Sequence, residues 1–236
     1  GITTKLTLKL YGIPEAISAG LCPFPSVEAA AQATILAIQS GLPVARIELL
    51  DSLQVKAVNQ YSKLTLPETP LLLLEFHGTD AGVKDQAERF ADIAAECGGG
   101  TFTWATAAEE RSRLWQARHD AYWAACALRP GAASISTDVC VPISRLAECI
   151  AETHADIADS QLIAPIVGHV GDGNFHVLPL IDMANADEVA RAKAFVERLV
   201  LRALAMEGTC TGEHGVGEGK MKYLEREHGT AALEMM

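Results

Sequence analysis

Hydrophobic positions along the chain recur at two spacings, which predict strands and helices in turn. Near the start, Ile2, Leu6, Leu8 and Leu10 stand among threonine and lysine, an alternation typical of a half-buried strand. Strands are expected at 1–10, 44–50, 71–77, 101–104 and 134–141, with strand, turn and strand over 163–181. Helices are expected over 27–39, 52–61, 80–97, 107–128, 144–158 and 185–207, and a last one begins at 231.

The way these elements are joined favours an α+β fold. The strands at 44–50 and 71–77 are joined without a helix long enough for a parallel crossover, and so are the strands within 163–181. An antiparallel sheet with helices packed on one face satisfies this order. The order also suggests two related halves, although no repeat in the sequence supports them. Ser26 is a good N-cap for the helix at 27–39.

Composition excludes several classes of protein. Of the 236 residues, 49% are hydrophobic and 21% are charged, which rules out an intrinsically disordered chain. The 19 basic and 30 acidic residues give a net charge of −11, so we expect no nucleic acid partner. No apolar run approaches the ~20 residues that a membrane-spanning helix needs. Six cysteines without a Cys-x-x-Cys pair are typical of a reducing compartment, which favours the cytoplasm.

The most informative segment is Gly-His-Val-Gly-Asp-Gly-Asn-Phe-His at 168–176. An Asp-Gly pair between apolar residues predicts a tight hairpin, with Asp172 and Gly173 at the turn. His169 then lies opposite His176 on one face, and two imidazoles held in this way can share a metal ion. The apolar residues of the hairpin would face the core. The alternative is that two histidines line a polar face by chance.

A glycine-rich loop at 208–219 holds the second set of candidate residues. A phosphate-binding loop is excluded, because His214 stands where a glycine is required and Met221 stands where Ser or Thr would follow the lysine. In an extended stretch the neighbours Glu213 and His214 point to opposite sides, so one can bind a metal while the other faces a substrate. Two histidines and Glu213 make a three-ligand set with an open position, which is typical of a catalytic metal. The alternative is a flexible loop without a ligand.

One arginine of the expected helix at 107–128 lies on its packed side. Arg118 has Trp115 three residues before it and Tyr122 four residues after it. A guanidinium in that position needs an anionic partner, and a substrate carboxylate would serve. Arg118 and Tyr122 are therefore candidate substrate-binding residues, whereas a solvated surface arginine is the alternative.

These motifs resemble the C-terminal region of FAD-linked oxidases of the vanillyl-alcohol-oxidase type. They are His-x-Gly-Asp-Gly-Asn-x-His at 169–176 and Gly-Thr-Cys-Thr-Gly-Glu-His-Gly-Val-Gly at 208–217. The segments Leu-Trp-Gln-Ala-Arg-His at 114–119 and Ser-Thr-Asp-Val-Cys-Val-Pro-Ile-Ser-Arg-Leu at 136–146 are similar to the D-lactate dehydrogenase (cytochrome) branch, close to the glycolate oxidase and D-2-hydroxyglutarate dehydrogenase branches. The resemblance covers nearly the whole chain. It implies a ferredoxin-like α+β cap over the flavin.

The resemblance implies a role for each candidate residue. His169, His176 and Glu213 would bind a divalent metal, zinc or manganese. His214 would be the base that takes the hydroxyl proton, and Arg118 would hold the substrate carboxylate. The expected activity is that of an FAD-dependent D-2-hydroxy-acid dehydrogenase, which oxidises the hydroxy acid to the 2-oxo acid.

Two positions differ from the dicarboxylate branch of the family. Ser136 stands where those relatives place a lysine, and Leu178 stands where they place an asparagine. Both differences remove partners for a second carboxylate, which favours a monocarboxylate such as D-lactate or a longer-tailed 2-hydroxy acid. The glycolate and D-2-hydroxyglutarate branches are the alternatives within the family.

The resemblance also implies that FAD is bound mainly by a domain outside this chain. Residues 1–20 resemble the last strand of that domain and a linker, and 21–236 would form the substrate- and metal-binding cap, truncated at its C-terminus. We expect the cap alone to be inactive. Its expected partners are the FAD-binding domain, a small 2-hydroxy acid and an electron acceptor such as cytochrome c, quinone or electron-transfer flavoprotein. The complete enzyme could be cytoplasmic and peripheral to a membrane.

Two rival functions from other classes remain open at this point. One is a flavin-independent, metal-binding hydrolase or sensor in which His214 activates a water. The other is a packing module that binds no metal. The hydrolase predicts activity without flavin, which separates it from the dehydrogenase.

Overall fold

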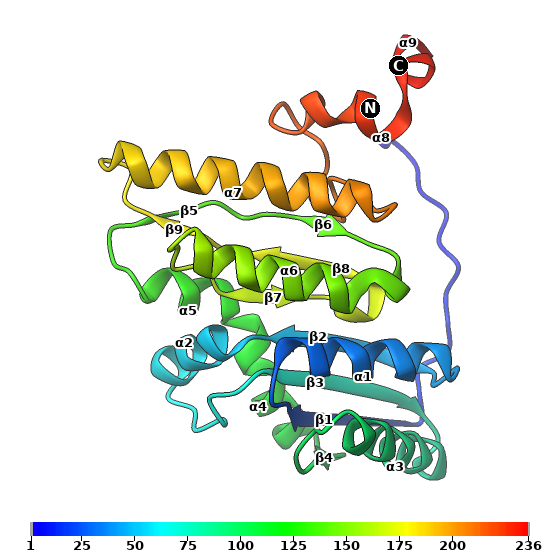
Figure 1. Ribbon diagram of the computed structural model, residues 1–236. Coiled ribbons are helices and arrows are strands. Elements are labelled where there is room, and N and C mark those ends of the chain that lie inside the picture. Colours follow the sequence, from blue (N-terminus) through cyan, green and yellow to red (C-terminus); the bar gives the residue numbers. More distant parts are fainter. Residues whose placement is uncertain (1, 236) are drawn as a thin grey trace.

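A seven-stranded antiparallel sheet forms the centre of the protein in the computed structural model, which describes residues 2–235 (Figure 1). Its strands, in spatial order, are β4 (Thr103–Ala105), β1 (Ala16–Pro23), β3 (Leu71–Gly78), β2 (Val44–Leu50), β7 (Ile166–Gly168), β8 (Asn174–Val177) and β6 (Val139–Cys140). A separate antiparallel pair joins β5 (Ala133–Ser134) to β9 (Leu180–Ile181). The predicted α+β class is confirmed.

Four helices lie side by side across one face of the sheet, as Figure 1 shows. They are α1 (Val27–Gln39), α3 (Asp80–Glu96), α6 (Leu146–Asp159) and α7 (Ala186–Ala205). On β3, Leu72 and Leu74 pack into the core beneath these helices, whereas Leu71 and Leu73 belong to a second core on the opposite face. The second core is covered by α2 (Ser52–Ser62), α4 (Ala108–His119) and α5 (Ala121–Ala127). The protein therefore has helices on both faces, and not on one face alone.

The sequence pattern places most helices within a few residues of their observed bounds. The Ser26 hydroxyl accepts a hydrogen bond from the Ala29 N–H at 3.2 Å, as expected of the N-cap of α1. The helix expected over 107–128 is interrupted at Asp120, whose carboxylate accepts hydrogen bonds from Ser62 on α2 and Gln116 on α4. Because of this interruption, α4 and α5 are separate helices. Two short C-terminal helices follow, α8 (Leu224–His228) and α9 (Thr230–Met235).

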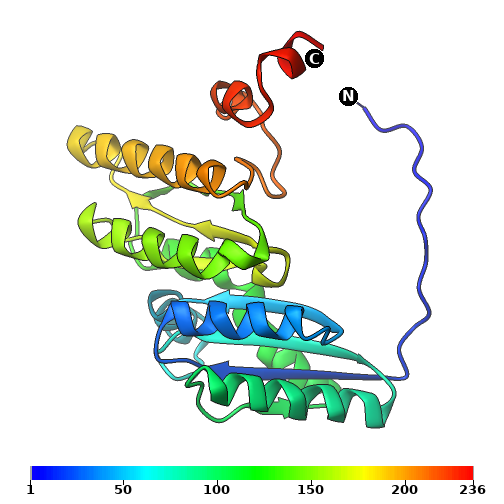
Figure 2. The same cartoon turned by 45° about the vertical axis from the view of Figure 1, so that its right-hand side comes forward.

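The strand predicted at 1–10 is not present in the part of that range that the structure describes, residues 2–10, which corrects the sequence analysis. Residues 2–14 are in no strand or helix, and Leu6 and Leu8 are exposed. In Figure 2 this segment runs away from the sheet. A period-2 pattern becomes a strand only when another strand edge supplies hydrogen bonds, and no described strand pairs with this segment. The boundary placed after residue 20 also falls inside β1, which pairs with β3 over its whole length from Ala16 to Pro23.

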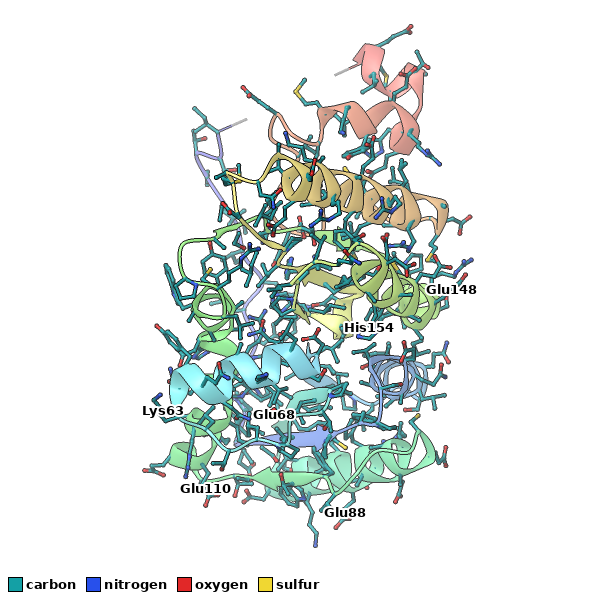
Figure 3. The ribbon with its side chains drawn as sticks, turned by 60° about the vertical axis from the view of Figure 1, so that its left-hand side comes forward. Lys63, Glu68, Glu88, Glu110, Glu148 and His154 are labelled. Carbon is teal, nitrogen blue, oxygen red and sulfur yellow. The ribbon has the colours of Figure 1, made fainter. Side chains whose placement is uncertain are left out.

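The outer surface of the helices is strongly polar. Charged residues such as Lys63, Glu88 and Glu148 are exposed and lie at the periphery in Figure 3. On α3, Phe90 is buried in the core while Glu88 faces solvent, the amphipathic pattern from which the helix was predicted. Within residues 2–235, no helix combines the length and the apolar character that crossing a membrane requires.

Candidate metal and substrate site

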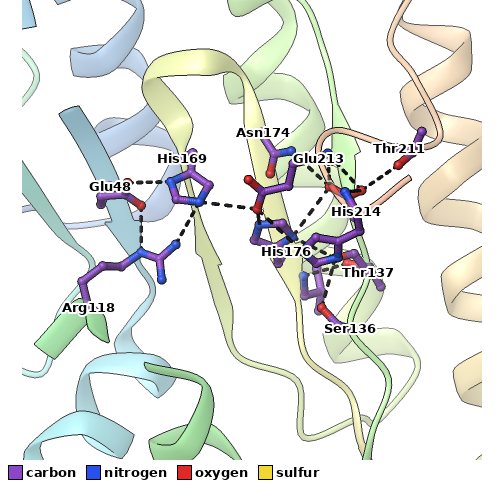
Figure 4. Close-up of polar contacts among 12 residues, drawn as sticks. Glu48, Arg118, Ser136, Thr137, His169, Asn174, His176, Thr211, Glu213 and His214 are labelled. Carbon is purple, nitrogen blue, oxygen red and sulfur yellow. Dashed lines mark hydrogen bonds and ion pairs between the residues drawn. The ribbon is translucent and has the colours of Figure 1, made fainter. Parts of the chain in front are cut away.

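His169, His176 and Glu213, the three predicted metal ligands, lie together on the second face of the sheet (Figure 4). Oε1 of Glu213 is 3.0 Å from Nε2 of His176 and 3.5 Å from Nε2 of His169. The potential ligand atoms of all three residues lie within 4.8 Å of one another. Two imidazole nitrogens and a carboxylate oxygen at such spacing form a donor set suited to zinc or manganese. The fold therefore brings together residues 44 positions apart in sequence.

The hairpin reaches this arrangement by a register that differs from the predicted one. His176 lies opposite Val167, not opposite His169, and Ile166 lies opposite Val177. The turn is longer than two residues, because 170–172 form a 3₁₀ turn and Gly173 follows with a φ of +78°. The displacement is two residues, and an even displacement keeps the side chains on the same faces of the sheet. His169, just beyond β7, therefore still faces the same side as His176.

Hydrogen bonds fix which ring nitrogen of each histidine faces the cluster. Nδ1 of His169 lies 2.6 Å from Oε1 of Glu48, and Nδ1 of His176 lies 2.9 Å from the Thr137 carbonyl oxygen. Both acceptors require a proton on Nδ1, which leaves the lone pair on Nε2, the nitrogen nearer to Glu213. Metal-binding histidines are held by such acceptors in general. The residues present are therefore suited to hold a divalent metal.

The surroundings of the two histidines affect their basicity in opposite directions. The hydrogen bond to Glu48 raises the pKa of His169, against the effect of burial. Burial lowers the pKa of His176, so this ring stays neutral at ordinary pH. A neutral ring keeps its lone pair for a metal, and a carboxylate behind the other ring makes that ring a stronger donor.

Asp138, on the segment before β6, anchors the loop that carries Glu213. Its buried carboxylate accepts hydrogen bonds from the backbone N–H groups of Glu213 and His214, at 3.1 and 2.9 Å. Further donors to it are Thr211 Oγ1, Asn174 Nδ2 and Lys220 Nζ. Burial opposes ionisation, but these donors hold the pKa of Asp138 well below its usual range.

Because its oxygens are already occupied, Asp138 is a poor metal ligand. The grouping of Asp138, His176 and His214, which is also compact, is thus less suited to a metal than the set with His169 and Glu213. The loop also approaches the hairpin closely at Gly212, where a Cβ atom would overlap Nδ2 of Asn174. Glycine is required there for the loop to reach the hairpin.

Glu213 and His214 do not point to opposite sides, which corrects the sequence analysis. Their residues belong to no strand, and both backbone N–H groups point at the same carboxylate of Asp138. The alternation expected of an extended stretch is therefore lost. The His214 ring stacks on His176 with ring centroids 4.9 Å apart and planes 4° apart. Both side chains consequently line one cavity.

This cavity, of about 210 Å³, also receives the two predicted substrate-binding residues. Arg118, at the end of α4, donates from Nε to Oε2 of Glu48 at 2.8 Å, and its Nη2 lies 3.2 Å from Nε2 of His169. Tyr122, on α5, is 45% exposed and lies on the cavity wall, not on a packed stripe. The cavity is lined by Arg118, Ala121, Tyr122, Ser136, Val167, His176, Leu178, Glu213 and His214.

The sequence analysis missed Glu48 and Asp138 as parts of the site. Each has a signal in the sequence, since each is the single acidic residue of an expected strand. A buried carboxylate in a strand must be paired or hydrogen-bonded. The pattern shows that a partner is required, but it cannot say which distant cation or N–H group provides it.

Asp138→Asn should weaken metal binding by about tenfold, because an amide cannot accept all the N–H bonds that fix Glu213 in place. The measurement is a competitive zinc titration of the protein with a chelator. Asp156→Asn is the matched control. Asp156 is also a buried carboxylate, and it accepts hydrogen bonds from Arg198 and Arg202, which do not belong to the site. Equal zinc affinities for the two variants would contradict the role given to Asp138.

A comparison with known families identifies the family of the chain. The model of the family "FAD linked oxidases, C-terminal domain" matches residues 13–236. The chain belongs to this family. The resemblance seen in the sequence motifs is thus confirmed, and FAD is the cofactor of the family to which this domain belongs.

Curated relatives narrow the comparison within the family. "Probable D-lactate dehydrogenase, mitochondrial" of Danio rerio is 52% identical over 236 residues, 100% of this chain and 48% of the relative. "D-lactate dehydrogenase [cytochrome], mitochondrial" of Arabidopsis thaliana is 42% identical over 100% of this chain and 42% of the relative. "Glycolate oxidase subunit GlcD" of Bacillus subtilis is 31% identical over 100% of this chain and 50% of that protein. The chain thus spans about half the length of these relatives.

Solved structures agree on the fold. The 4-ethylphenol oxidase of Gulosibacter chungangensis superposes with a TM-score of 0.65 over 97% of this chain and 53% of that chain, at 14% sequence identity. At this identity the likeness concerns the fold alone. The antiparallel sheet and its helices are therefore shared with that structure as a fold.

Proposed function

We propose that this chain is the substrate- and metal-binding part of an FAD-dependent D-2-hydroxy-acid dehydrogenase that oxidises D-lactate or a similar monocarboxylate. The observation that carries the proposal is the cluster of His169, His176 and Glu213, because His176 and Glu213 line one small cavity with Arg118 and His169 Nε2 lies 3.2 Å from Arg118 Nη2. Such a site can hold a metal and a carboxylate side by side. The names of the two most similar relatives described above support the same activity.

The residues divide the work between binding and proton transfer. His169, His176 and Glu213 would hold zinc or manganese, which when bound acts as a Lewis acid toward substrate oxygen atoms. Arg118 keeps Nε on Glu48 and has Nη2 3.2 Å from Nε2 of His169, and it would offer the N–H groups that these contacts leave free to the substrate carboxylate. His214, which is 46% exposed in its side chain, is reachable from solvent and would accept the hydroxyl proton.

The flavin would be supplied from outside these residues. FAD would be bound mainly by another domain of the full-length protein, and it would supply the hydride-accepting chemistry of the reaction. We expect this chain by itself to be inactive for that reason. We predict that the electron acceptor is cytochrome c, a quinone or an electron-transfer flavoprotein. A cytoplasmic, membrane-peripheral location is likewise a prediction. The two D-lactate dehydrogenase relatives are named as mitochondrial.

The cavity walls favour a small monocarboxylate. Beyond the histidines, Arg118 is the one cationic residue among those that line the cavity, and its neighbours Leu178, Val167 and Ala121 are apolar. A second carboxylate placed against these walls would be desolvated without a partner, which is costly. Ser136, also on the wall, can offer a hydroxyl but no charge. We therefore place D-lactate ahead of D-2-hydroxyglutarate; glycolate is the nearer alternative.

Turnover of the full-length flavoprotein with D-lactate, L-lactate, glycolate and D-2-hydroxyglutarate tests the proposal. We expect the highest kcat/KM with D-lactate and no reaction once the flavin is removed. Activity that persists in the flavin-free protein, such as ester or amide hydrolysis, would favour the metal-dependent hydrolase instead.

Arg118→Ala should raise the KM for D-lactate by about 10–100-fold with a smaller change in kcat, since the carboxylate contact exists in both the ground and transition states. Arg118→Lys should recover only part of the loss, because an ammonium group cannot reproduce a planar two-donor contact. Steady-state kinetics measure both effects. Arg113→Ala, an exposed arginine on the same helix, should behave as the unmodified protein. A KM unchanged in Arg118→Ala would contradict the assignment.

A further inference from the structure

Glu48, on β2, contacts both the metal-ligand side and the substrate side of the site. Its Oε1 lies 2.6 Å from Nδ1 of His169, and its Oε2 accepts a hydrogen bond from Nε of Arg118 at 2.8 Å. The side chain is only 6% exposed. Each oxygen thus serves a different partner, and the partners lie 121 and 70 residues away in the sequence. Figure 4 shows the carboxylate between the two side chains.

The position of Glu48 follows from the alternation of β2. Ile47 and Leu49 point into the core beneath α1, so Glu48 and Leu50 point to the opposite face, where α4 packs. β7 pairs with β2 on the side next to His169, with Leu49 opposite Gly168. The carboxylate therefore lies between the helix that carries Arg118 and the turn that carries His169.

A carboxylate in this position is costly unless both oxygens are used. Burial of an ionised group is unfavourable unless it is paired and hydrogen-bonded. Glu48 meets this condition through a guanidinium and an imidazole N–H. The same pairing restrains the two partner side chains. A proton held on Nδ1 of His169 directs Nε2 of that ring to the cluster. The contact that fixes Nε of Arg118 directs the rest of its guanidinium to the cavity.

We propose that Glu48 is a positioning residue that fixes the metal ligand His169 and the substrate-binding Arg118 relative to each other. The proposal rests on the proposed function for its substrate side. Because one rigid strand residue holds both groups, its loss should weaken metal binding and substrate binding together. A residue with a merely structural role would change stability alone.

The neighbouring strand offers a matched comparison. Glu75, on β3, is also 6% exposed and also pairs with an arginine and a histidine, although both contact the same oxygen, Oε1: Arg46 at 3.2 Å and His77 at 2.8 Å. Neither partner belongs to the cavity or to the metal cluster. Glu75→Gln therefore reproduces the cost of changing a buried, doubly paired glutamate in this sheet without touching the site.

The experiment compares Glu48→Gln with Glu75→Gln in the full-length protein. Glutamine keeps the size, but its amide can accept from one partner only and turns an NH₂ donor toward the other. For Glu48→Gln we expect about tenfold weaker zinc binding by chelator competition, together with about a tenfold higher KM for D-lactate. For Glu75→Gln we expect neither change, whereas the melting temperatures of both variants should fall to a similar extent.

The outcomes separate this proposal from the proposed function. The zinc affinity is measured without turnover, so it tests the role of Glu48 independently of the reaction. If the protein oxidised no 2-hydroxy acid, that result would overturn the proposed function but not the effect of Glu48 on metal binding. If Glu48→Gln had the same zinc affinity and the same KM as Glu75→Gln, the positioning role would be overturned. Should Glu48→Gln not fold, Glu48→Asp, which is too short to reach both partners, must show the same paired loss. An unchanged zinc affinity and KM in Glu48→Asp would overturn the role equally.

Discussion

Removing either histidine of the cluster should strip the metal from the protein. His176→Ala and His169→Ala each delete one of the three proposed ligands. Losing a residue that only hydrogen-bonds to a ligand lowers metal affinity by about 10–100-fold, so losing a ligand itself should lower it further. Glu213→Gln should lower metal content only in part, because the amide oxygen remains a weaker donor. Elemental analysis after dialysis against metal-free buffer gives the metal-to-protein ratio.

Two further measurements make this result specific. His154 is exposed and lies on α6, which covers the opposite face of the sheet from the cluster, so His154→Ala should keep the full metal content. The melting temperature separates metal loss from unfolding, since His176 is buried and its removal leaves a small cavity. If both histidine variants retained the metal, the cluster of His169, His176 and Glu213 would not be its binding site.

Local sequence signals predicted the elements whose partners lie close by in the chain. The helix at 27–39 and the strand at 44–50 have the predicted bounds, because caps and periodicity are local properties. The interruption at Asp120 was not predictable in this way, since it is stabilised by Ser62, 58 residues away. The segment at 1–10 failed for the related reason that a strand needs an edge to pair with.

At the site, too, the residue types were predictable from the sequence, whereas their geometry was not. His169, His176 and Glu213 were predicted as candidate ligands from their chemistry and spacing, and the fold brings these three residues together. The hairpin register did not follow, because Asp-Gly predicts a two-residue turn whereas a 3₁₀ turn forms. Glu48 and Asp138 were missed because the groups that they hold come from distant segments. The sequence spacing therefore indicated the candidate ligands, but the residues that hold them in place were visible only in the fold.

His214→Asn should leave metal content intact and lower kcat by about 10²–10⁴-fold, the usual contribution of a positioned general base. Asparagine can still hydrogen-bond but cannot take up a proton. The loop should keep its place, because Asp138 holds it through the backbone N–H of His214 and not through the ring. Anaerobic stopped-flow measurement of flavin reduction by D-lactate would report this step directly.

The stacked geometry makes the division of labour between Glu213 and His214 a sharp question. Oε1 of Glu213 lies 3.6 Å from Nε2 of His214, so either side chain is near enough to the His176 ring to act with it. Glu213 also approaches Nε2 of His169, whereas His214 contacts His176 through its ring face, which offers no lone pair. We therefore expect metal loss from Glu213→Gln and turnover loss from His214→Asn. If His214→Asn strips the metal while Glu213→Gln keeps it, the two roles are exchanged, and if neither variant changes flavin reduction, the loop takes no part in the reaction.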